Sequence, residues 1–551
     1  MDLQRALMAI ILSFLILIGY QYFFAPPAVR QPAGVQQKIS AKAELKASME
    51  QAAKPVAPAT AVHSVKVNPT ARDIIVETPL YTAVINEQGG GFKRFVLKKY
   101  RKKLAKDSGL VQLVHTSSPA ELPMLFTLDN GSAATLPILR ADRQKLVLTD
   151  PEGSARLVMT GTLPNGIQIV RTMVFHADTY LVDVSYQVKN ISSAPLQISP
   201  AVTLTNKPFV ATSKATSHYL FSGPSAYING KLEEIKGKKM RKDGPQTLRG
   251  KVTWAAYEGT YFLCAVMPLS GTSHLVTMSG DESQARVVVS DGSMTLAPQD
   301  ARDFKYKMYF GPKKLSILDA ADHDLAKAVN FGWFDVIAKP MLWLLNFFYK
   351  YIGNYGVAII LVTILIKVVF WPITQKGMKS MKNMQKLQPK VAKLKEKFKD
   401  DPTRMNKEMM ALYKTYKVNP VGGCLPMVIQ IPFFFALYRV LMSAIELRHA
   451  PFLLWINDLS APDRLMIGFN IPWLHGIPVL TLLMGVSMYL QQKMTPTTAD
   501  PTQAKIMQFL PVIFTFMFIN FASGLVLYWF VNNLLAILQQ YLINRQSRVA
   551  A

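Results

Sequence analysis

The sequence predicts a polytopic α-helical membrane protein with six transmembrane helices, a large antiparallel β-sandwich outside the membrane and a helical hairpin in the cytoplasm. Three observations predict this fold class: long uncharged runs near the N-terminus and after residue 330, a segment between them in which apolar and polar residues alternate, and basic residues beside the apolar runs. Apolar residues make up 50% of the 551 residues and charged residues only 18%, which excludes an intrinsically disordered protein. The net charge of +27 also suits a nucleic-acid binder, but its position beside apolar runs favours a membrane protein.

The first apolar run, Ala6 to Phe24, contains no charged residue. As a helix it would be about 28 Å long, enough to cross a bilayer. A cleaved signal peptide is the alternative, but the run exceeds the usual apolar core of such a peptide, and Ala25-Pro26-Pro27 after it lacks a small-x-small cleavage signal. We therefore expect an uncleaved anchor.

Four further apolar runs follow residue 330, and the last is too long for one span. Residues Ile506 to Ile543 would form a helix of about 57 Å, nearly twice a hydrocarbon core of about 30 Å, so the run must fold back. The Gly and Ser within 521–524 favour a turn there. Six spans then place Arg5, the basic loop 373–419 and Arg545 on one side, which the positive-inside rule makes cytoplasmic.

The segment between the anchor and the later spans divides into two parts. Residues 25–70 are rich in Ala, Pro, Gln and Lys and predict a flexible linker. From Asp73 to Gly311 the sequence contains strand-like runs separated by turn residues. In Tyr180 to Lys189 apolar and polar residues alternate, and Val252 to Val266 is largely apolar. This pattern predicts one large antiparallel β-sandwich. Cys264 lies in such a run, so a buried core thiol is a better interpretation than a nucleophile.

The sequence shows no linear motif for catalysis or for a cofactor. There is no HExxH, GxSxG or GxxxxGK[ST] pattern, and two cysteines exclude a disulfide scaffold and a thiolate zinc cluster. We therefore predict no catalytic residue, no metal and no cofactor. A large β-sandwich can still hold a carbohydrate site made of dispersed residues, so a membrane-tethered periplasmic carbohydrate-handling enzyme remains the alternative function.

Residues Asn330 to Lys350 combine aromatic and charged side chains, which predicts an amphipathic helix on the outer membrane surface, broken at Pro340. An early start of the second span is the alternative.

Lys367 is the most informative residue of the spans. It lies about 13 Å inside the membrane when counted from Lys376, where a cation costs about 3 kcal/mol. One interpretation is that it extends to the cytoplasmic headgroups; the other is a hydrated, positively charged cavity. The spans contain further polar residues and no acidic residue, which favours the cavity and argues against an ion-coupled transporter. These polar residues are Thr363, Gln430, Ser487, Asn532 and Asn533.

Residues 373–419 hold 13 basic and 4 acidic residues, and their apolar residues are regularly spaced. Apolar residues recur at spacings of three and four, which predicts two helices packed as an antiparallel hairpin. The two apolar sets are Met384, Leu387, Val391, Leu394 and Phe398, then Met405, Met409, Leu412 and Tyr416. Asp401 is the expected N-cap of the second helix, with Pro402 at its first position, and Pro389 is expected to kink the first helix.

The outward face of the hairpin is basic. It is either a solvated face or a docking surface for anionic lipid, ribosomal RNA or a nascent chain. The docking interpretation assigns contacts to Lys379, Lys382, Lys386, Lys390, Lys393 and Lys397, with Met381 and Met384 as pliable apolar contacts.

Several short motifs resemble one known family. They are Pro372-Ile373-Thr374, Leu387-Gln388-Pro389-Lys390, Met409-Met410-Ala411-Leu412-Tyr413, Asn419-Pro420-Val421-Gly422-Gly423-Cys424 and Ser523-Gly524-Leu525-Val526-Leu527-Tyr528-Trp529. In this order they resemble the conserved half of the YidC membrane protein insertases, over residues 340–545. The first 330 residues are similar in layout to the branch found in two-membrane bacteria, which implies an anchor and a periplasmic β-super-sandwich.

The resemblance implies an insertase and foldase, acting alone or with the Sec translocon, that uses a hydrophilic groove open to the cytoplasm and the lipid. The family's groove usually carries an arginine where this chain has Lys367. The lysine keeps the positive charge but lacks the planar guanidinium that donates two parallel hydrogen bonds. We assign the groove to Lys367, Thr363, Gln430, Ser487, Tyr528, Trp529, Asn532 and Asn533. The expected partners are nascent membrane proteins, the Sec translocon, the ribosome and anionic lipids.

The expected location is the inner membrane of a two-membrane bacterium, with both termini cytoplasmic. The expected order is anchor 1–24, linker 25–70, β-domain 71–330, interfacial helix 331–350, second span 351–372, hairpin 373–419, third span 420–442, periplasmic loop 443–464, fourth span 465–492, cytoplasmic loop 493–505, fifth span 506–521, turn 522–524, sixth span 525–543 and tail 544–551.

Overall fold

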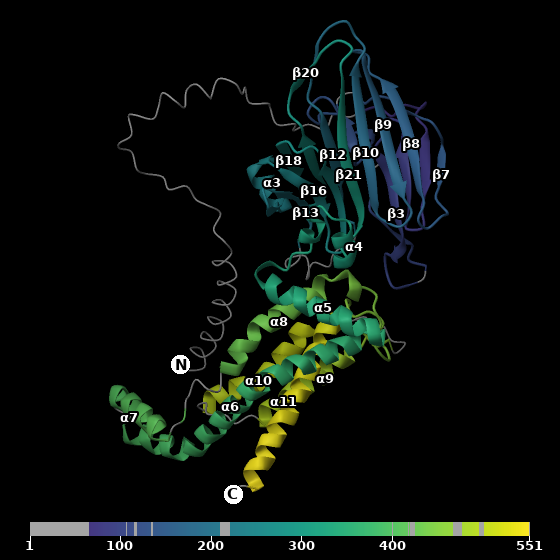
Figure 1. Cartoon of the computed structure of the whole chain (residues 1–551). Helices are drawn as coiled ribbons and strands as arrows, with labels where there is room; N and C mark the ends of the chain where they lie inside the picture. Colours follow the sequence, from purple (N-terminus) through teal and green to yellow (C-terminus); the bar gives the residue numbers. More distant parts are fainter. Residues whose placement is uncertain are drawn as a thin grey trace, which may run out of the picture.

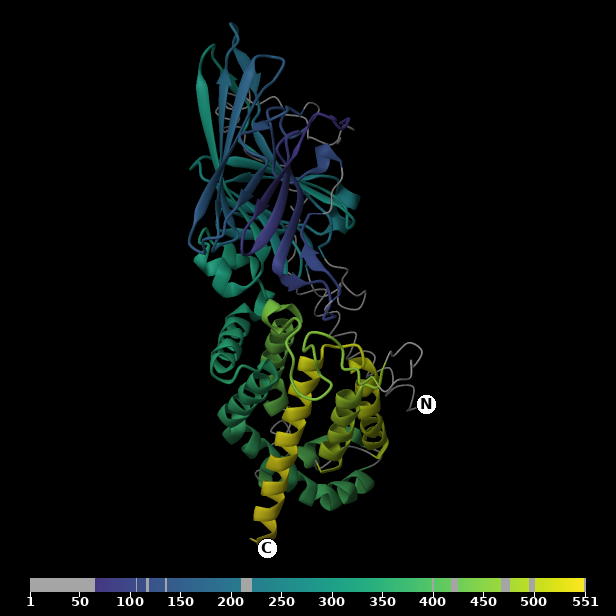
Figure 2. The ribbon, with the colours of Figure 1, turned by 90° about the vertical axis from the view of Figure 1, so that its right-hand side faces the viewer.

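The computed structural model describes residues 65–549, apart from 106, 115–117, 134–135, 210–220, 399–400, 417, 419–424, 467–475 and 495–500. The predicted anchor 1–24, most of the linker and the motif at 419–424 lie outside the described residues. The described chain forms a β-domain and a helical region that lies against one end of it (Figure 1, Figure 2).

The β-domain is built from three large sheets. The nine-stranded sheet has the order β14-β13-β16-β17-β21-β10-β9-β8-β6, and the two five-stranded sheets have the orders β15-β18-β19-β12-β5 and β4-β3-β2-β1-β7. The strands are β1 Asp73–Glu77, β2 Tyr81–Asn86, β3 Phe92–Arg101, β4 Leu110–Gln112, β5 Leu125–Thr127, β6 Arg140–Ala141, β7 Lys145–Val147, β8 Ser154–Thr162, β9 Ile167–His176, β10 Leu181–Asn190, β11 Leu196–Ile198, β12 Ala201–Asn206, β13 Gly223–Ile228, β14 Lys231–Glu234, β15 Gln246–Gly250, β16 Val252–Glu258, β17 Phe262–Pro268, β18 His274–Gly280, β19 Ala285–Ser290, β20 Met294–Leu296 and β21 Ala301–Pro312.

The predicted sandwich is confirmed, because the inner faces of two sheets pack on each other. In β10, buried and more accessible residues alternate, as a strand with one buried face requires. Tyr186 of β10 stacks on Phe126 of β5 at 4.0 Å between ring centroids, which joins the nine-stranded sheet to a five-stranded one. Cys264 is fully buried in β17, and burial raises the pKa of its thiol, as expected for a core residue.

Two details of the β-domain differ from the sequence-based expectation. The sheets are not wholly antiparallel, because β1 and β7 pair in parallel. The apolar run Val252 to Val266 is not one strand but two, β16 and β17, which form a hairpin. The backbone N–H of Gly259 donates to the carbonyl of Phe262 at 2.9 Å and closes the turn between them. Both strands are buried on both faces, so apolar periodicity does not mark the turn.

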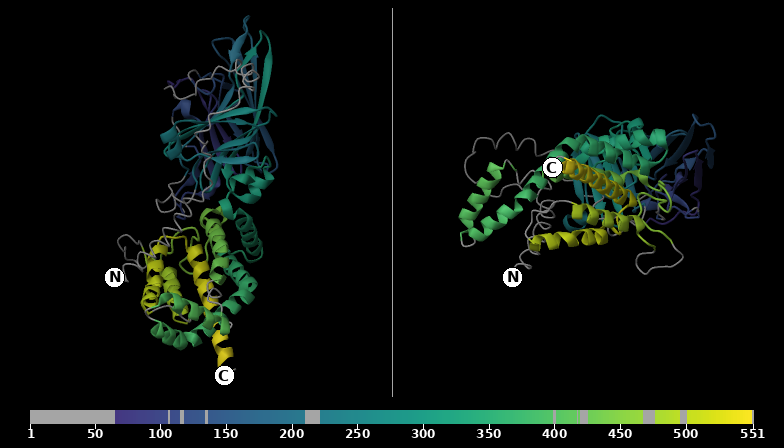
Figure 3. Two further views of the ribbon diagram at one scale, coloured as in Figure 1. Left: turned by 90° about the vertical axis from the view of Figure 1, so that its left-hand side faces the viewer. Right: turned by 90° about the horizontal axis from the view of Figure 1, so that it is seen from below.

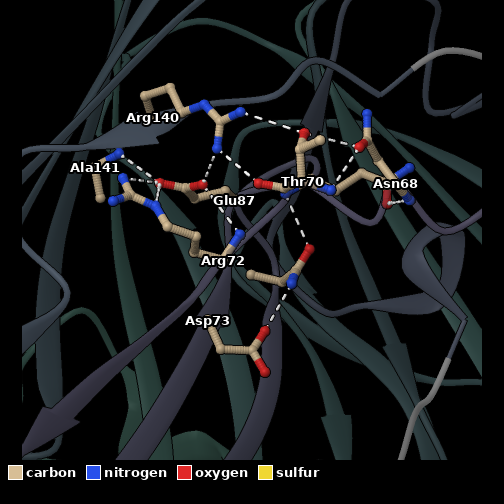
Figure 4. Close-up of polar contacts among 9 residues, drawn as sticks. Asn68, Thr70, Arg72, Asp73, Glu87, Arg140 and Ala141 are labelled. Atoms are coloured by element: carbon tan, nitrogen blue, oxygen red, sulfur yellow. Dashed lines mark hydrogen bonds and ion pairs between the residues drawn. The ribbon is translucent and has the colours of Figure 1, made fainter.

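A buried carboxylate connects two of the sheets. Glu87 follows β2, its side chain is fully buried, and it accepts hydrogen bonds from the guanidinium groups of Arg72 (2.7 Å) and Arg140 (2.8 Å) and from the backbone N–H of Ala141 (3.1 Å) (Figure 4). Arg140 and Ala141 form β6 of the nine-stranded sheet. Desolvation raises the pKa of Glu87, but these hydrogen bonds outweigh it and lower the pKa to about 2.

The helical region contains most of the apolar helices. Two short helices precede it, α3 Gly237–Asp243 and α4 Leu315–Ala320. The helices of the region itself are α5 Asp335–Ile352, α6 Tyr355–Lys397, α7 Pro402–Thr415, α8 Leu425–Ser443, α9 Val479–Met494, α10 Pro501–Phe518 and α11 Ser523–Val549. Among the described residues, Tyr355–Leu394 and Ser523–Arg545 are long and apolar enough to cross a membrane, and Ile429–Ser443 and Gln508–Phe518 are shorter apolar helices. Six spans are therefore not established by these helices alone.

Three helices differ from their expected limits. α5 runs through Pro340 without a break, because Pro340 lies in the second turn and removes a single backbone donor. α6 is one helix from the apolar run into the first arm of the hairpin, although Pro372 and Pro389 lie inside it. α9 begins only at Val479, after a short antiparallel bridge between Leu465 and Ile477.

The long apolar run 506–543 is divided between α10 and α11. The loop before α9 holds the start of α11: the backbone N–H groups of Ser523 and Gly524 donate to the carbonyls of Ala461 (2.7 Å) and Leu459 (2.9 Å). A Cβ at Gly524 would lie 3.1 Å from the Leu459 carbonyl oxygen, so this close approach favours glycine.

Arg448 is one residue that connects the β-domain to the helical region. Arg448, in the loop after α8, donates to two backbone carbonyls of the β-domain. They belong to Arg101, the last residue of β3 (2.7 Å), and to Lys102, which follows it (2.9 Å). Its guanidinium also lies over the rings of Tyr261 and Phe262. The loop between α8 and α9 therefore contacts both regions.

We expect Glu87 to make the stability of the β-domain depend on pH. Because its pKa is lower in the folded chain than in the unfolded chain, its contribution is present above about pH 4.5 and is lost as the pH falls toward 2. That contribution is roughly 3 kcal/mol at neutral pH. Glu87→Gln should therefore destabilise the full chain at pH 7 and have less effect near pH 2, as measured by chemical unfolding in detergent followed by circular dichroism.

Asp73→Asn is the matched control. Asp73 pairs with Lys93 at 2.7 Å on the surface of the same sheet, so its loss should cost less than about 1 kcal/mol. An equal effect of the two substitutions at pH 7 would contradict the role assigned to Glu87.

Candidate functional site

Polar pairs join α6 and α11 at three levels. The ammonium of Lys367 donates to Asn532 Oδ1 at 3.1 Å, Gln539 Nε2 donates to Thr374 Oγ1 at 2.8 Å, and the ammonium of Lys382 donates to Asn544 Oδ1 at 3.3 Å. The partners occur in the same order along both helices, so α6 and α11 run in parallel. We call these three pairs the polar seam.

Lys367 lies between the two helices and is only 6% exposed. No ion pair between described residues includes Lys367, and its hydrogen-bond acceptor is a neutral amide. An ammonium can only donate, so the oxygen of the Asn532 amide must face it. The positive charge is therefore hydrogen-bonded but not neutralised.

The neighbouring asparagine faces a different helix. Asn533 is 2% exposed, and its Nδ2 donates to Ser487 Oγ of α9 at 3.0 Å. Ser487 in turn donates to the Met484 carbonyl of its own helix at 2.6 Å. Adjacent residues of an α-helix point about 100° apart, so this asparagine pair connects α11 to α6 on one side and to α9 on the other. We call Lys367, Asn532, Asn533 and Ser487 the polar layer.

An aromatic cluster lies next to the polar layer, toward the β-domain. Trp529 precedes Asn532 by about one helical turn, and its ring contacts Phe434 of α8 (4.8 Å between centroids) and Phe518 of α10 (5.0 Å). The ring centroid of Tyr528 lies 6.2 Å from that of Phe434. We call Phe434, Phe514, Phe518, Tyr528 and Trp529 the aromatic layer. It joins α8 to α10, although the two helices are not neighbours in the sequence.

The remaining predicted site residues are placed less directly. Thr363 is buried one turn from Lys367 and donates to the Ile359 carbonyl of its own helix. Gln430 is half-buried in α8, one turn before Phe434. The structure therefore brings Lys367 together with Asn532, and Ser487 together with Asn533, but it gives Thr363 a backbone partner.

Sequence analysis missed the lower part of the polar seam. Gln539 is fully buried, and Thr374, which it contacts, also donates to the carbonyls of Phe370 and Trp371. The available signal was a glutamine inside the last apolar run, at the same seven-residue spacing from Asn532 as Thr374 has from Lys367.

The hairpin lies at the end of the helical region that is distant from the β-domain (Figure 1, Figure 3). Its second helix begins as predicted: the Asp401 side chain accepts the Arg404 N–H, and Pro402 is the first helical residue. The seam is shifted from the predicted one, because Tyr413 packs on Met384, Leu387 and Val418, whereas Tyr416 is exposed.

The basic residues of the hairpin are mostly accessible. Lys379, Lys386, Lys390, Lys393 and Lys397 are exposed, whereas Lys382 and Met381 are half-buried and Met384 is buried. Lys390 contacts the ring and hydroxyl of Tyr416. Several predicted docking residues therefore also have contacts inside the protein: Met384 in the hairpin seam, Lys382 in the polar seam and Lys390 with Tyr416. Their role in docking stays a prediction.

Comparison with known proteins covers nearly the whole chain. Residues 347–550 match the family described as 60Kd inner membrane protein, and residues 73–344 match the YidC periplasmic domain. The membrane protein insertase YidC of Syntrophobacter fumaroxidans is 40% identical, over 99% of this chain and 100% of that protein. The protein of the same name from Geobacter sulfurreducens is 41% identical, over 99% of both. The chain belongs to the YidC family.

A crystal structure described as an active YidC insertase, with its first transmembrane domain resolved, covers 87% of this chain and 95% of that chain, with 20% identity and a TM-score of 0.36. Membership of the YidC family identifies the β-domain as the periplasmic domain and the chain as an inner membrane protein. The resemblance predicted from the motifs is confirmed. The relatives are insertases and not enzymes, so the carbohydrate-handling alternative has no support.

We expect the hairpin fold and its basic face to be separable by substitution. Leu387→Asp places a charge in the buried seam of the hairpin and should destabilise it by more than about 2 kcal/mol. Lys386→Glu with Lys393→Glu changes two exposed residues and should leave the hairpin folded. Limited chymotrypsin digestion of the full chain in detergent should therefore cut near residues 398–416 much faster in the first variant only.

The same double variant tests the docking interpretation. If the basic face binds anionic partners, the charge reversal should weaken binding of the full chain to ribosomes or to phosphatidylglycerol vesicles at low salt. Unchanged binding to both would leave the solvated-face interpretation.

Proposed function

We propose that this chain is a membrane protein insertase and foldase that receives nascent hydrophobic segments and releases them into the bilayer. The observation that carries the proposal is the un-neutralised ammonium of Lys367 among apolar helices, in a chain that is 40% identical to curated insertases over their full length. A cation in this position is unfavourable for an apolar bundle alone, so a functional role is the default interpretation.

The proposed path of a substrate follows the chemistry of the two layers. The polar flank of an incoming segment enters from the cytoplasmic side and reaches the polar layer, where an acidic residue is attracted to Lys367. The aromatic layer blocks further passage toward the periplasm. The apolar part of the segment then moves along α8 and α10 into the lipid, and the exposed apolar residues of α10 support this exit. These residues are Phe509, Val512, Ile513 and Phe516.

The free energy for insertion comes from hydrophobic partitioning and the membrane potential. The sequence has no nucleotide-binding GxxxxGK[ST] motif. Burial of a span in lipid is favourable by about 0.8 kcal/mol per CH₂ group, and the potential contributes about 2.3 kcal/mol per charge per 100 mV.

The proposed topology has six spans with both termini in the cytoplasm. The proposal is supported by the basic residues of the hairpin and of the C-terminal end of α11 at one end of the helical region, and by the periplasmic domain at the other. The hairpin then faces the ribosome, anionic lipids and the Sec translocon as partners.

Single-cysteine labelling checks this topology. In intact cells with a permeabilised outer membrane, a cysteine at Ser460 should react with an impermeant maleimide, whereas one at Lys393 should react only after lysis. The native cysteines are first replaced by alanine. Rapid labelling at Lys393 before lysis would contradict the model of the topology.

Reconstituted insertion tests the proposed function. A single-span substrate with Asp-Asp, Asn-Asn or Lys-Lys in its translocated flank is inserted into liposomes that contain the full chain. Lys367→Arg should retain insertion of all three substrates, whereas Lys367→Ala should lower insertion of the acidic substrate by about tenfold and affect the neutral one much less.

Lys367→Glu should be the worst variant for the acidic substrate, because it adds repulsion. Liposomes without the protein give the baseline. If the wild type does not insert any substrate above that baseline, the proposed function is wrong; if Lys367→Ala affects all three flanks equally, Lys367 is only a structural residue.

A further inference from the structure

We propose that Asn532 is a positioning residue for Lys367 that sets the preference of the insertase for acidic flanks. This inference rests on the proposed function and adds a determinant of substrate specificity at the same site. It starts from one contact, the 3.1 Å hydrogen bond from the Lys367 ammonium to Asn532 Oδ1.

The geometry gives Asn532 control over the position of the charge. Lysine has four rotatable side-chain bonds, so without a fixed acceptor its ammonium can extend toward the cytoplasmic headgroups. Lys367 does not do so in this structure: it is 6% exposed and lies against α11. Asn532 thus holds the ammonium about one helical turn from Trp529, at the border between the polar layer and the aromatic layer.

The chemistry of the acceptor preserves the charge. An aspartate in place of Asn532 would accept the same hydrogen bond but neutralise the ammonium. The neutral amide uses one of three N–H donors and leaves two donors and the full positive charge for a carboxylate of the substrate. Asn532 is itself half-buried, not fully enclosed, so it lies at the edge of the polar layer.

The two asparagines have different partners, which separates positioning from helix packing. Asn533 is enclosed and bonded to Ser487 of α9, and it has no hydrogen bond to Lys367 in the described part of the chain. Gln539 pairs with Thr374 across the same α6–α11 interface but two turns away. Of these three side chains, Asn532 alone is hydrogen-bonded to the cation.

The test measures the ratio of acidic-flank to neutral-flank insertion with the Asp-Asp and Asn-Asn substrates in liposomes. Asn532→Ala removes the acceptor and should lower this ratio by roughly threefold, the size of one net hydrogen bond. Asn532→Asp should lower it by about tenfold, because it neutralises Lys367. Asn532→Gln keeps a neutral carbonyl acceptor and should restore most of the ratio.

Gln539→Leu is the matched control. It removes a buried polar pair of the same seam without touching Lys367, and Thr374 keeps its two backbone acceptors, so the ratio should not change. The thermal midpoint of each purified variant in detergent reports separately whether the helices still pack. A ratio lowered as much by Gln539→Leu as by Asn532→Ala would overturn the proposal.

A double variant shows whether Asn532 acts through the cation. In the Lys367→Ala background, Asn532→Ala should have no further effect on the ratio; a further loss would contradict the proposal. An unchanged ratio in both Asn532→Ala and Asn532→Asp would also contradict it. In these cases insertion of the neutral substrate by the wild type still supports the proposed function, so the two failures are distinguishable.

Discussion

The hydrogen bond between Lys367 and Asn532 satisfies one donor of a cation that is buried between two apolar helices. A cation among apolar helices costs about 3 kcal/mol by insertion measurements, and an unsatisfied donor adds to that cost. The helices α6 and α11, which carry these residues, are also the two in the described part of the chain that are long and apolar enough to cross a membrane. Their relative register is therefore fixed by polar contacts, whereas apolar side chains against each other or against lipid discriminate weakly between registers.

The polar seam has consequences beyond the membrane region. Because α6 is continuous from Tyr355 to Lys397, its position also determines where the hairpin begins. Lys382 donates to Asn544 near the end of α11. The helix α11 therefore holds both Lys367 and the base of the hairpin. At the opposite end, the loop that contacts the start of α11 belongs to the connection that carries Arg448, which binds the β-domain. The helix α11 thus contacts the α8–α9 loop at one end of the helical region and the base of the hairpin at the other.

The sequence predicted those features that depend on local chemistry. An aspartate followed by proline marked the start of α7, alternating residues marked β10, and a lone lysine in an apolar run marked the candidate site. It did not predict which face of a helix meets which neighbour. Asn532 and Asn533 are chemically identical in the sequence, but one bonds α6 and the other α9. For the same reason the hairpin pattern favoured Tyr416 over Tyr413, because two helices of similar period can pack in more than one register. The β16–β17 turn was missed because strands buried on both faces lack alternation.

Lysine and asparagine at this site are best understood as one unit. An arginine, which the resemblance to the family implies at this position, would have a planar group with five donors and would require several acceptors to satisfy it, whereas an ammonium is compact and is held by one carbonyl oxygen. Asn532 supplies one such oxygen and no charge. An arginine at position 367 would present donors that Asn532 alone does not satisfy, and it would need water or substrate for the others. The effect of a change at position 367 therefore depends on the residue at position 532, and comparisons among members of the family need to treat the two positions together.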